Sequence, residues 1–266
     1  MKKHNVLLLF FALLYAFCLY VYLGLYSLSY WSLLSNQLYL IPPLLAVLGG
    51  LYAVTRYGKG NPHGRALLYF SLGISALFVG ELLWLYYEHI LGADPFPSLA
   101  DVFYIVSYPL MIIGIFKEIR ISNRKEQLPS WKVAIPVALL IAVSSFYFIY
   151  QAYDYEASLI ENTFSMGYGL GDIILVVAGV YIFRIMRDYS GGRMASAWLM
   201  IGIGLILTLI ADVLFSFFYQ QYEESLYAYA QIDLVWSLAY LFFSYGLFKI
   251  GFIIDDIRQK VIKSCG

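Results

Sequence analysis

The chain has 266 residues, of which 62% are hydrophobic and only 13% are charged, with equal numbers of acidic and basic side chains. Soluble domains are about half apolar and about a quarter charged, so a soluble fold of this length would expose more apolar surface than water tolerates. The composition excludes an ordinary soluble protein and indicates lipid as the solvent.

The first apolar stretch begins after Lys2 and Lys3 and continues past Tyr22. A basic start followed by an apolar run is also typical of a secretory signal peptide, but the apolar core of such a peptide is about 7–15 residues long. This run is longer, and no convincing cleavage site of small residues follows it. We interpret it as the first membrane span.

Seven further apolar stretches follow, separated by polar or Gly- and Pro-bearing connections. Each is long enough to cross about 30 Å of hydrocarbon at about 1.5 Å per residue. Backbone groups in lipid must be hydrogen-bonded within their own segment, so each stretch must be a helix. The predicted spans are residues 5–26, 37–56, 66–90, 101–118, 132–152, 164–185, 196–219 and 232–253.

Charge predicts the orientation of these eight spans. All 17 lysines and arginines fall at the N-terminus, in the connections after spans two, four and six, or at the end of span eight and beyond it. Basic residues beside spans mark the cytoplasmic face, so both ends of the chain are predicted to be cytoplasmic and the protein to lie in the cell membrane. Aromatic residues near the outer ends are typical of interfacial belts. The acidic residues expected at the outer face are Glu88, Asp94, Asp101, Asp154, Glu156, Glu161, Glu223, Glu224 and Asp233.

The chain is similar to itself at an offset near 131 residues. Gly73 aligns with Gly204, and Glu81 with Asp212. After one inserted residue, the further pairs are Asp101 with Asp233, Tyr108 with Tyr240, Gly114 with Gly246 and Lys117 with Lys249. We therefore predict an all-α integral membrane protein made of two tandem four-helix repeats, residues 1–131 and 132–254, followed by a short cytoplasmic tail, 255–266. The expected symmetry is a pseudo-two-fold axis along the membrane normal, as in parallel-repeat transporters.

Five acids lie where no basic side chain is available to pair with them. Glu81, Asp172 and Asp212 fall in the outer half of the bilayer, and Asp101 and Asp233 begin spans four and eight at the outer face. A carboxylate buried in lipid is costly, so it becomes protonated, finds hydrogen-bond donors or binds a cation.

Two interpretations of these acids stay open. In the functional one, they line a symmetric cavity that opens outward and binds a proton, a metal cation or a cationic organic ligand. In the structural one, they accept hydrogen bonds from tyrosine hydroxyls, Trp84, Trp236 or helix ends and hold the helices together. Ser98 and Asp101 also have the spacing of a capping box, in which Ser98 would cap the start of a helix and Asp101, at its third position, would bond back to it.

Motifs for catalysis and for cofactors are absent from the sequence. His4 and His63 are cytoplasmic by this topology and His89 is external, so no intramembrane histidine pair can hold haem. No lysine lies mid-membrane for a retinal Schiff base, and no metalloprotease, hydrolase or phosphate-loop pattern occurs. We expect no enzyme activity and no nucleic-acid partner, because the basic residues serve the topology. The sequence specifies no cofactor and no oligomeric state.

The stretch Pro97-Ser-Leu-Ala-Asp101-Val-Phe-Tyr, followed by Tyr108-Pro-Leu and Gly114, resembles a multi-span membrane module. That module forms the N-terminal region of many bacterial diguanylate cyclases and cyclic-di-GMP phosphodiesterases and of some archaeal sensor histidine kinases. Residues 212–246 are similar to its later spans. The resemblance covers mainly spans three, four, seven and eight, and it implies a sensory role with an unidentified ligand.

No cyclase, phosphodiesterase or kinase domain follows span eight in this sequence. We therefore expect a signal to leave through a cytoplasmic partner or through the tail. The first hypothesis is a non-enzymatic sensor or ligand-binding module. The second is a secondary transporter coupled to protons or cations. The lack of polar residues in the inner half of the predicted spans counts against this second hypothesis.

Overall fold

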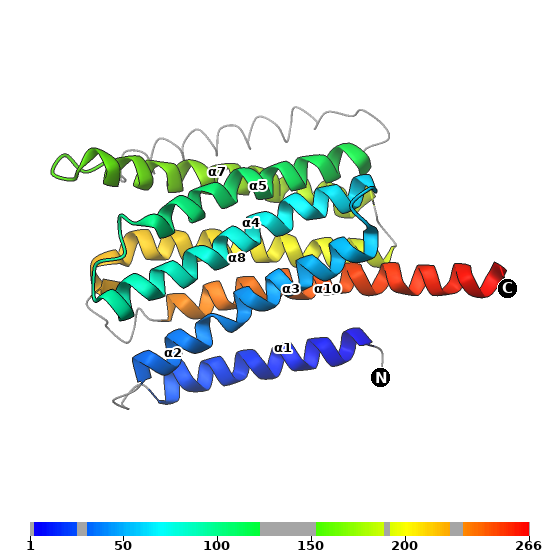
Figure 1. Cartoon of the computed structure of the whole chain (residues 1–266), viewed down its shortest axis with the longest axis horizontal. Helices are drawn as coiled ribbons and strands as arrows, with labels where there is room; N and C mark the ends of the chain where they lie inside the picture. The colour runs from blue at the N-terminus through cyan, green and yellow to red at the C-terminus, as the bar shows by residue number, and fades with distance from the viewer. Residues whose placement is uncertain (1–2, 26–30, 123–152, 189–191, 224–230, 266) are drawn as a thin grey trace.

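The computed structural model describes residues 3–25, 31–122, 153–188, 192–223 and 231–265, and within these ranges the chain is helical with no strand (Figure 1). The helices are α1 (Lys3–Leu19), which continues into the π-helical turn η1 (Tyr20–Gly24), α2 (Trp31–Tyr39), α3 (Ile41–Tyr57), α4 (Pro62–Leu85), which continues into η2 (Tyr86–Leu91), α5 (Leu99–Ser122), α7 (Leu159–Asp188), α8 (Arg193–Glu223) and α10 (Ile232–Cys265).

Six helical stretches of the described chain are long and apolar enough to cross a membrane, which makes this a polytopic α-helical membrane protein. Each of them overlaps a predicted span. The predicted fifth span, 132–152, lies outside the described residues. The sixth, 164–185, falls within α7, a 30-residue helix that is not one of the six, so the count of eight stays a prediction. The six stretches are Lys3–Gly24, Leu34–Tyr57, Pro62–Leu91, Leu99–Ile121, Arg193–Phe218 and Ile232–Ser264.

The second span differs from the single helix predicted over residues 37–56. Helix α2 ends at Tyr39, and α3 begins at Ile41 with Pro42 and Pro43 in its first turn. Proline lacks a backbone N–H and fits a helix start, where that group has no intrahelical partner. The two prolines therefore begin a new helix at this point and leave Tyr39 at the end of the preceding one.

Side-chain caps define the starts of two long helices. The Ser98 hydroxyl accepts a hydrogen bond from the backbone N–H of Ala100 at 3.1 Å, and Asp101 accepts one from the backbone N–H of Ser98 at 2.7 Å. The capping box predicted for this position is thus confirmed. Ser158 and Glu161 make the same reciprocal pair at the start of α7. Both caps satisfy N–H groups that a helix start would otherwise leave unpaired.

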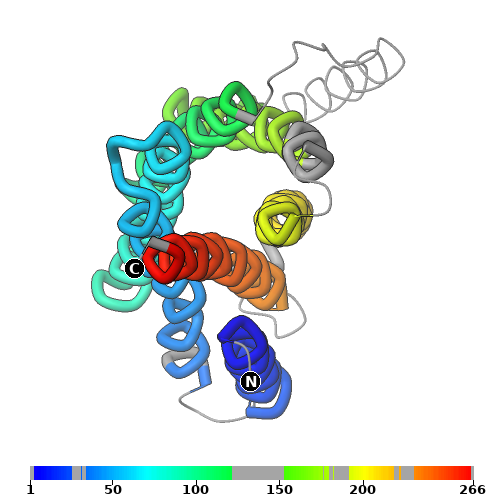
Figure 2. Tube along the Cα trace, turned by 90° about the vertical axis from the view of Figure 1, so that its right-hand side faces the viewer, coloured from blue at the N-terminus to red at the C-terminus, as the bar shows by residue number. Residues whose placement is uncertain are grey.

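Six helices form a closed ring in which each contacts two neighbours. The order around the ring is α3, α4, α5, α7, α8, α10 and back to α3. Viewed end-on, α1 lies outside this ring, against α10 (Figure 2). The six helices pack around one apolar core that includes Phe70 and Phe243. The phenyl groups of these two residues meet edge to face with a centroid distance of 5.9 Å.

Glycines allow close backbone approach in two helix pairs of the ring. A β-carbon on Gly73 of α4 would lie 2.9 Å from the carbonyl oxygen of Ser107 on α5, and one on Gly204 of α8 would lie 3.1 Å from that of Ala239 on α10. Real β-carbons rarely come this close, so only glycine fits. The second helix of each pair also has such a glycine. A β-carbon on Gly114 of α5 would lie 2.8 Å from the carbonyl oxygen of Ala66 on α4, and one on Gly246 of α10 would lie 2.8 Å from that of Ala197 on α8.

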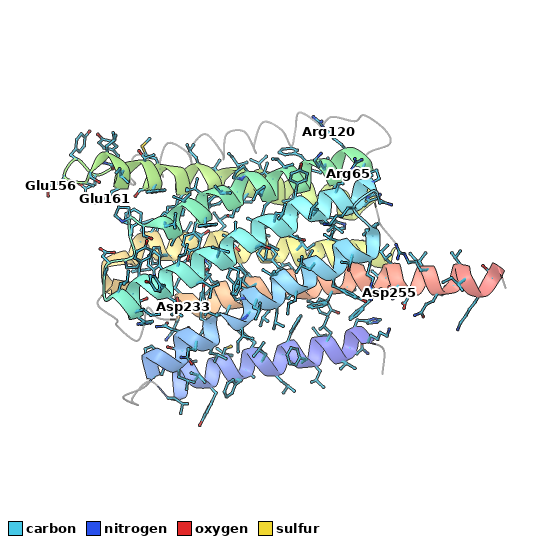
Figure 3. The ribbon with its side chains drawn as sticks, viewed as in Figure 1. Arg65, Arg120, Glu156, Glu161, Asp233 and Asp255 are labelled. Carbon is cyan, nitrogen blue, oxygen red and sulfur yellow. The ribbon has the colours of Figure 1, made fainter. Side chains whose placement is uncertain are left out.

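Charged side chains separate along the length of the bundle. Arg65 and Arg120 lie at the end where both chain termini are found, whereas Glu156 and Glu161 lie at the opposite end (Figures 1 and 3). Some acids also lie at the basic end, where they pair with basic residues: Asp255 with Arg56, Asp256 with Arg193 and Glu118 with His63. We call the end with the two termini the basic end and the opposite one the acidic end.

Helix α10 is longer than a membrane is thick. Its 34 residues, at about 1.5 Å each, extend about 51 Å, and its last turns project beyond the bundle at the basic end (Figure 1). Residues 255–265, predicted to be a separate tail, continue this helix without a break. Asp255 holds it to α3 through the Tyr52 hydroxyl at 2.6 Å and Arg56 at 3.3 Å.

Candidate ligand cavity

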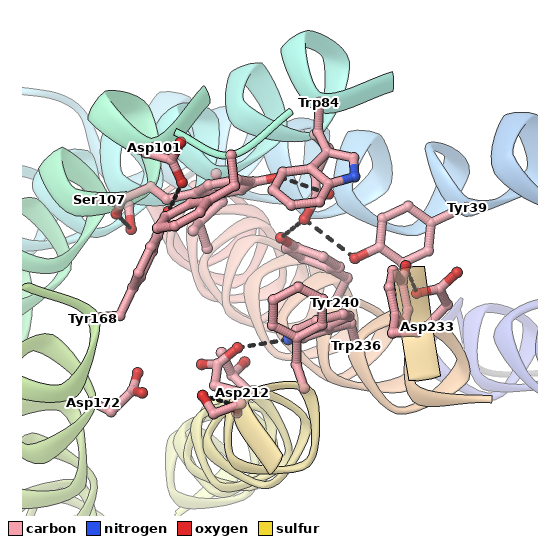
Figure 4. A pocket seen from close by; sticks show the side chains of 18 of the residues that line it. Tyr39, Trp84, Asp101, Ser107, Tyr168, Asp172, Asp212, Asp233, Trp236 and Tyr240 are labelled. Carbon is pink, nitrogen blue, oxygen red and sulfur yellow. Dashed lines mark hydrogen bonds between the residues drawn. The ribbon is translucent and has the colours of Figure 1, made fainter. Parts of the chain in front are cut away.

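A cavity of about 560 Å³ lies inside the ring toward the acidic end. Glu81, Asp101, Asp172, Asp212 and Asp233 all line it, one each from α4, α5, α7, α8 and α10. Figure 4 shows four of these acids, Asp101, Asp172, Asp212 and Asp233, around the cavity on different helices. Among the described residues that line the cavity, none is lysine, arginine or histidine.

Glu81 accepts hydrogen bonds from three tyrosines of three other helices. The hydroxyls of Tyr39 and Tyr240 donate to its Oε1 at 3.2 and 2.8 Å, and that of Tyr104 donates to its Oε2 at 3.0 Å. These bonds join α4 to α2, α10 and α5. Glu81 is therefore the best-satisfied acid of the cavity, and its contacts match the structural interpretation.

Asp212 and Asp172 have fewer donors. The Trp236 indole donates to Asp212 at 2.7 Å, and the Tyr108 hydroxyl donates to Asp172 at 2.7 Å. The two carboxyl groups also lie near enough to interact with each other. Of the five predicted acids, these two accept the fewest hydrogen bonds from tyrosine, tryptophan or backbone groups, and no basic residue is among the described residues that line the cavity.

Asp101 and Asp233 begin their helices and are held by tyrosines as well. The Tyr168 hydroxyl donates to Asp101 at 2.5 Å, which connects α5 with α7. Asp233 accepts from Tyr222 at 2.7 Å and from Tyr22 at 3.2 Å. Each of these two acids thus joins its own helix to other helices of the bundle, in agreement with the structural role considered for both.

Aromatic rings form much of the remaining wall. Phe215 packs against three other aromatic rings, with centroid distances of 6.2 Å to Trp84, 5.4 Å to Trp236 and 5.0 Å to Tyr222. Such rings present an apolar face with negative charge density, which favours cations. The eleven aromatic residues that line the cavity are Tyr39, Trp84, Phe96, Tyr104, Tyr108, Tyr168, Phe215, Phe217, Tyr222, Trp236 and Tyr240.

The sequence contains a spacing that could have located these aromatic partners. Asp101 is followed by Tyr104 and Tyr108, and Asp233 by Trp236 and Tyr240, at the third and seventh positions in both cases. Residues spaced in this way lie on one face of a helix. All six line the cavity, so this face of each helix forms cavity wall rather than part of an interfacial belt alone.

A metal centre finds no support in the described residues, where no three His, Cys, Asp or Glu side chains are grouped so as to hold an ion. The cavity instead combines carboxylates, phenol and indole donors and apolar ring faces. This combination suits a ligand that carries positive charge and apolar surface together. Comparison with protein-family models, with curated proteins and with solved structures found no match.

Proposed function

We propose that the protein is a membrane sensor that binds a cationic ligand in this cavity. The observation that carries the proposal is the wall itself: five helices contribute the five predicted acids to a single cavity, Glu88 of η2 adds a sixth, and the lining includes no basic residue among those described. The resemblance of the Pro97–Tyr108 region to sensory membrane modules agrees with it.

An outward-facing cavity follows from the proposed topology. Basic residues beside spans mark the cytoplasmic face, and Arg65 and Arg120 lie at the end opposite to Glu156 and Glu161 (Figure 3). We place the basic end and both termini in the cytoplasm. The cavity, toward the acidic end, would then receive ligands from outside the cell.

The proposed fold is a pair of four-span repeats within eight spans. The glycine contacts support it, because Gly73 and Gly204 are aligned in the sequence and meet carbonyl groups of aligned residues, Ser107 and Ala239. The ring order supports it too. If α3, α4 and α5 correspond to α7, α8 and α10, then each helix contact of the ring has a counterpart: α3–α4 corresponds to α7–α8, α4–α5 to α8–α10, and α5–α7 to α10–α3. A pseudo-two-fold axis would then pass through the centre of the ring.

An organic cation is the ligand class that fits best within the proposal. A volume of about 560 Å³ falls in the range of small-molecule sites, about 300–1,000 Å³, and far exceeds the space one ion needs. Asp172 and Asp212 would neutralise the charge while ring faces contact the apolar part, each favourable cation–ring contact contributing about 0.5–2 kcal/mol.

Helix α10 connects the cavity to the cytoplasmic end of the protein and would transmit a conformational change caused by ligand binding. Asp233, Trp236 and Tyr240 belong to its cavity wall, and the same unbroken helix reaches the projecting end beyond Asp255. A ligand that draws this wall inward would tilt or rotate the whole helix, because a packed helix moves as a unit. A cytoplasmic partner would read the displaced end.

The test is ligand-dependent thermal stability of the purified full chain in detergent, screened against quaternary ammonium compounds, polyamines and guanidinium compounds. We expect one class to raise the melting temperature of the wild type, its uncharged analogue to have little effect, and Asp212→Asn to abolish the shift. The control is Glu156→Gln, an exposed acid outside the cavity, which should respond as wild type does. An equal shift in wild type and Asp212→Asn, or no shift with any class, would contradict the proposal.

A proton- or cation-coupled transporter is the second candidate, favoured by the repeat-like glycine contacts. Transport requires access from both ends, yet Phe70, Ile74, Phe243 and Leu247 are fully or almost fully buried in the core between the cavity and the basic end. Uptake of the stabilising cation into proteoliposomes under a proton gradient would decide for transport. Binding without uptake would decide for sensing.

A further inference from the structure

A second cavity, of about 620 Å³, lies at the basic end. It is formed where α1 and α8 begin and where α10 leaves the bundle. Lys3 and His4 come from α1, Arg193 and Ser196 from α8, and Lys249 from α10. These positions are far apart in the sequence, so only the folded bundle brings the charges together.

The wall of this cavity is positively charged. Three permanent cations, Lys3, Arg193 and Lys249, stand against one carboxylate, Asp256, which accepts a hydrogen bond from Arg193 at 2.7 Å. Within the described part of the chain, neither lysine forms an ion pair. The charges of Lys3 and Lys249 are thus not neutralised by a carboxylate of the described residues, and Lys249 lies over the Tyr245 ring with its ammonium 5.3 Å from the ring centroid.

Backbone dipoles add to the attraction for an anion. Helix α1 begins at Lys3, and the 31-residue helix α8 begins at Arg193. The first turn of a helix has unpaired N–H groups and the positive end of the helix dipole. Two helix starts and three cations therefore converge on one cavity.

The cavity lies at the depth of the lipid headgroups. Lys3 and Arg193 are the first residues of their spans. Counted from Ile232, the roughly 20 residues that cross the hydrocarbon core end close to Lys249. The helix that forms one wall, α1, is apolar and widely exposed beyond the cavity, with Leu13 61% exposed, so acyl chains can lie beside it.

We propose that this cavity binds the headgroup of an anionic phospholipid. The phosphate would contact Lys3 and Lys249, and the acyl chains would follow α1 into the bilayer. Basic pockets between transmembrane helices at a membrane surface have the charge and the depth for this ligand. A bound lipid would fasten α1 and α8 to α10 immediately before its projecting end. The proposal depends only on the membrane location of the bundle, and not on the ligand or the orientation of the acidic cavity.

The experiment is native mass spectrometry of the purified full chain with phosphatidylglycerol or phosphatidylcholine added. We expect saturable adducts of the anionic lipid on the wild type, about fivefold weaker in Lys249→Gln, as one lost charge near the surface implies, and retained in Lys249→Arg. The matched control is Lys260→Gln, an exposed lysine of α10 outside the cavity, which should bind as wild type does.

Three outcomes would overturn the proposal. Equal adducts with both lipids would show that the charge is irrelevant, and equal weakening in Lys249→Gln and Lys260→Gln would show attraction without a site. Complete displacement of the lipid by inorganic phosphate would identify a small-anion site instead. Far-ultraviolet circular dichroism of the Lys249 variants keeps a folding defect distinguishable from lost lipid binding.

Discussion

Replacing Glu81 by leucine should destabilise the bundle more than the same change at any other acid of the cavity. The Glu81 carboxylate accepts three interhelical hydrogen bonds, from Tyr39, Tyr104 and Tyr240. Hydrogen bonds between membrane helices contribute about 0.6 kcal/mol each, so Glu81→Leu should lower the free energy of unfolding by about 2 kcal/mol. Asp212, which accepts from one side chain, Trp236, should lose about 0.6 kcal/mol in Asp212→Leu.

Glutamine at position 81 gives an intermediate case. Two of the three phenols donate to Oε1 and one to Oε2, and an amide keeps one oxygen but replaces the other by a donor. Glu81→Gln should therefore lose about one bond, or about 0.6 kcal/mol. The order of stability we expect is wild type, then Glu81→Gln, then Glu81→Leu.

The assay is reversible unfolding of the purified chain in mixed micelles, followed by circular dichroism. The control is Ser75→Ala on the same helix, because the Ser75 hydroxyl bonds only to the backbone of its own helix, at Ser71, and should matter little. The reasoning is refuted if Asp212→Leu costs as much as Glu81→Leu, or if Glu81→Leu is indistinguishable from Ser75→Ala.

Three further predictions follow from helix contacts. Gly204→Ala should cost about 1–3 kcal/mol by overpacking, because its β-carbon would lie 2.6 Å from the Phe243 ring and 3.1 Å from the Ala239 carbonyl oxygen. Gly202→Ala should cost clearly less in the same assay, because its nearest contact would be Cγ2 of Ile182 at 3.2 Å. Asp255→Asn, which weakens the attachment of α10 to α3, should speed hydrogen exchange in the residues after it and leave the α10 cavity wall unchanged. Tyr168→Phe should lower stability by about 0.6 kcal/mol without faster exchange at the start of α5, because the Ser98 cap is independent of it.

Hydropathy and charge alone predicted much of this architecture, because lipid leaves the backbone few alternatives. Apolar runs separated by charged connections had to become helices, and six of the predicted spans correspond to helices long enough to cross. The capping box at Ser98 and Asp101 is a local pattern, and local patterns can be found without knowing the fold. The common cavity, by contrast, needed the ring order of the helices, which no single span contains.

Helix α7 shows what a single span can and cannot predict. The sequence predicts a span over 164–185, and α7 covers it with 30 residues. It carries Asp172, which lines the cavity, and the run from Gly167 to Gly171. Gly167 and Gly171 would place β-carbons against Ile105 and Tyr108 of α5. The helix was predictable from apolar content, whereas the helix that these glycines contact depends on the ring order.

Helix α10 contributes residues to both cavities, so the two proposed ligands would act on one element. Asp233, Trp236 and Tyr240 belong to the acidic cavity, and Lys249 belongs to the basic one. Asp255 and Asp256 then tie the helix to α3 and α8 through Arg56 and Arg193. A cation drawn toward Asp212 and an anionic headgroup drawn toward Lys249 would act on the same rigid helix at opposite ends. Coupling between two binding sites is reciprocal. If a bound lipid stabilises one position of α10, it would change the affinity of the acidic cavity for its ligand by some factor. The ligand would then change the affinity for the lipid by the same factor.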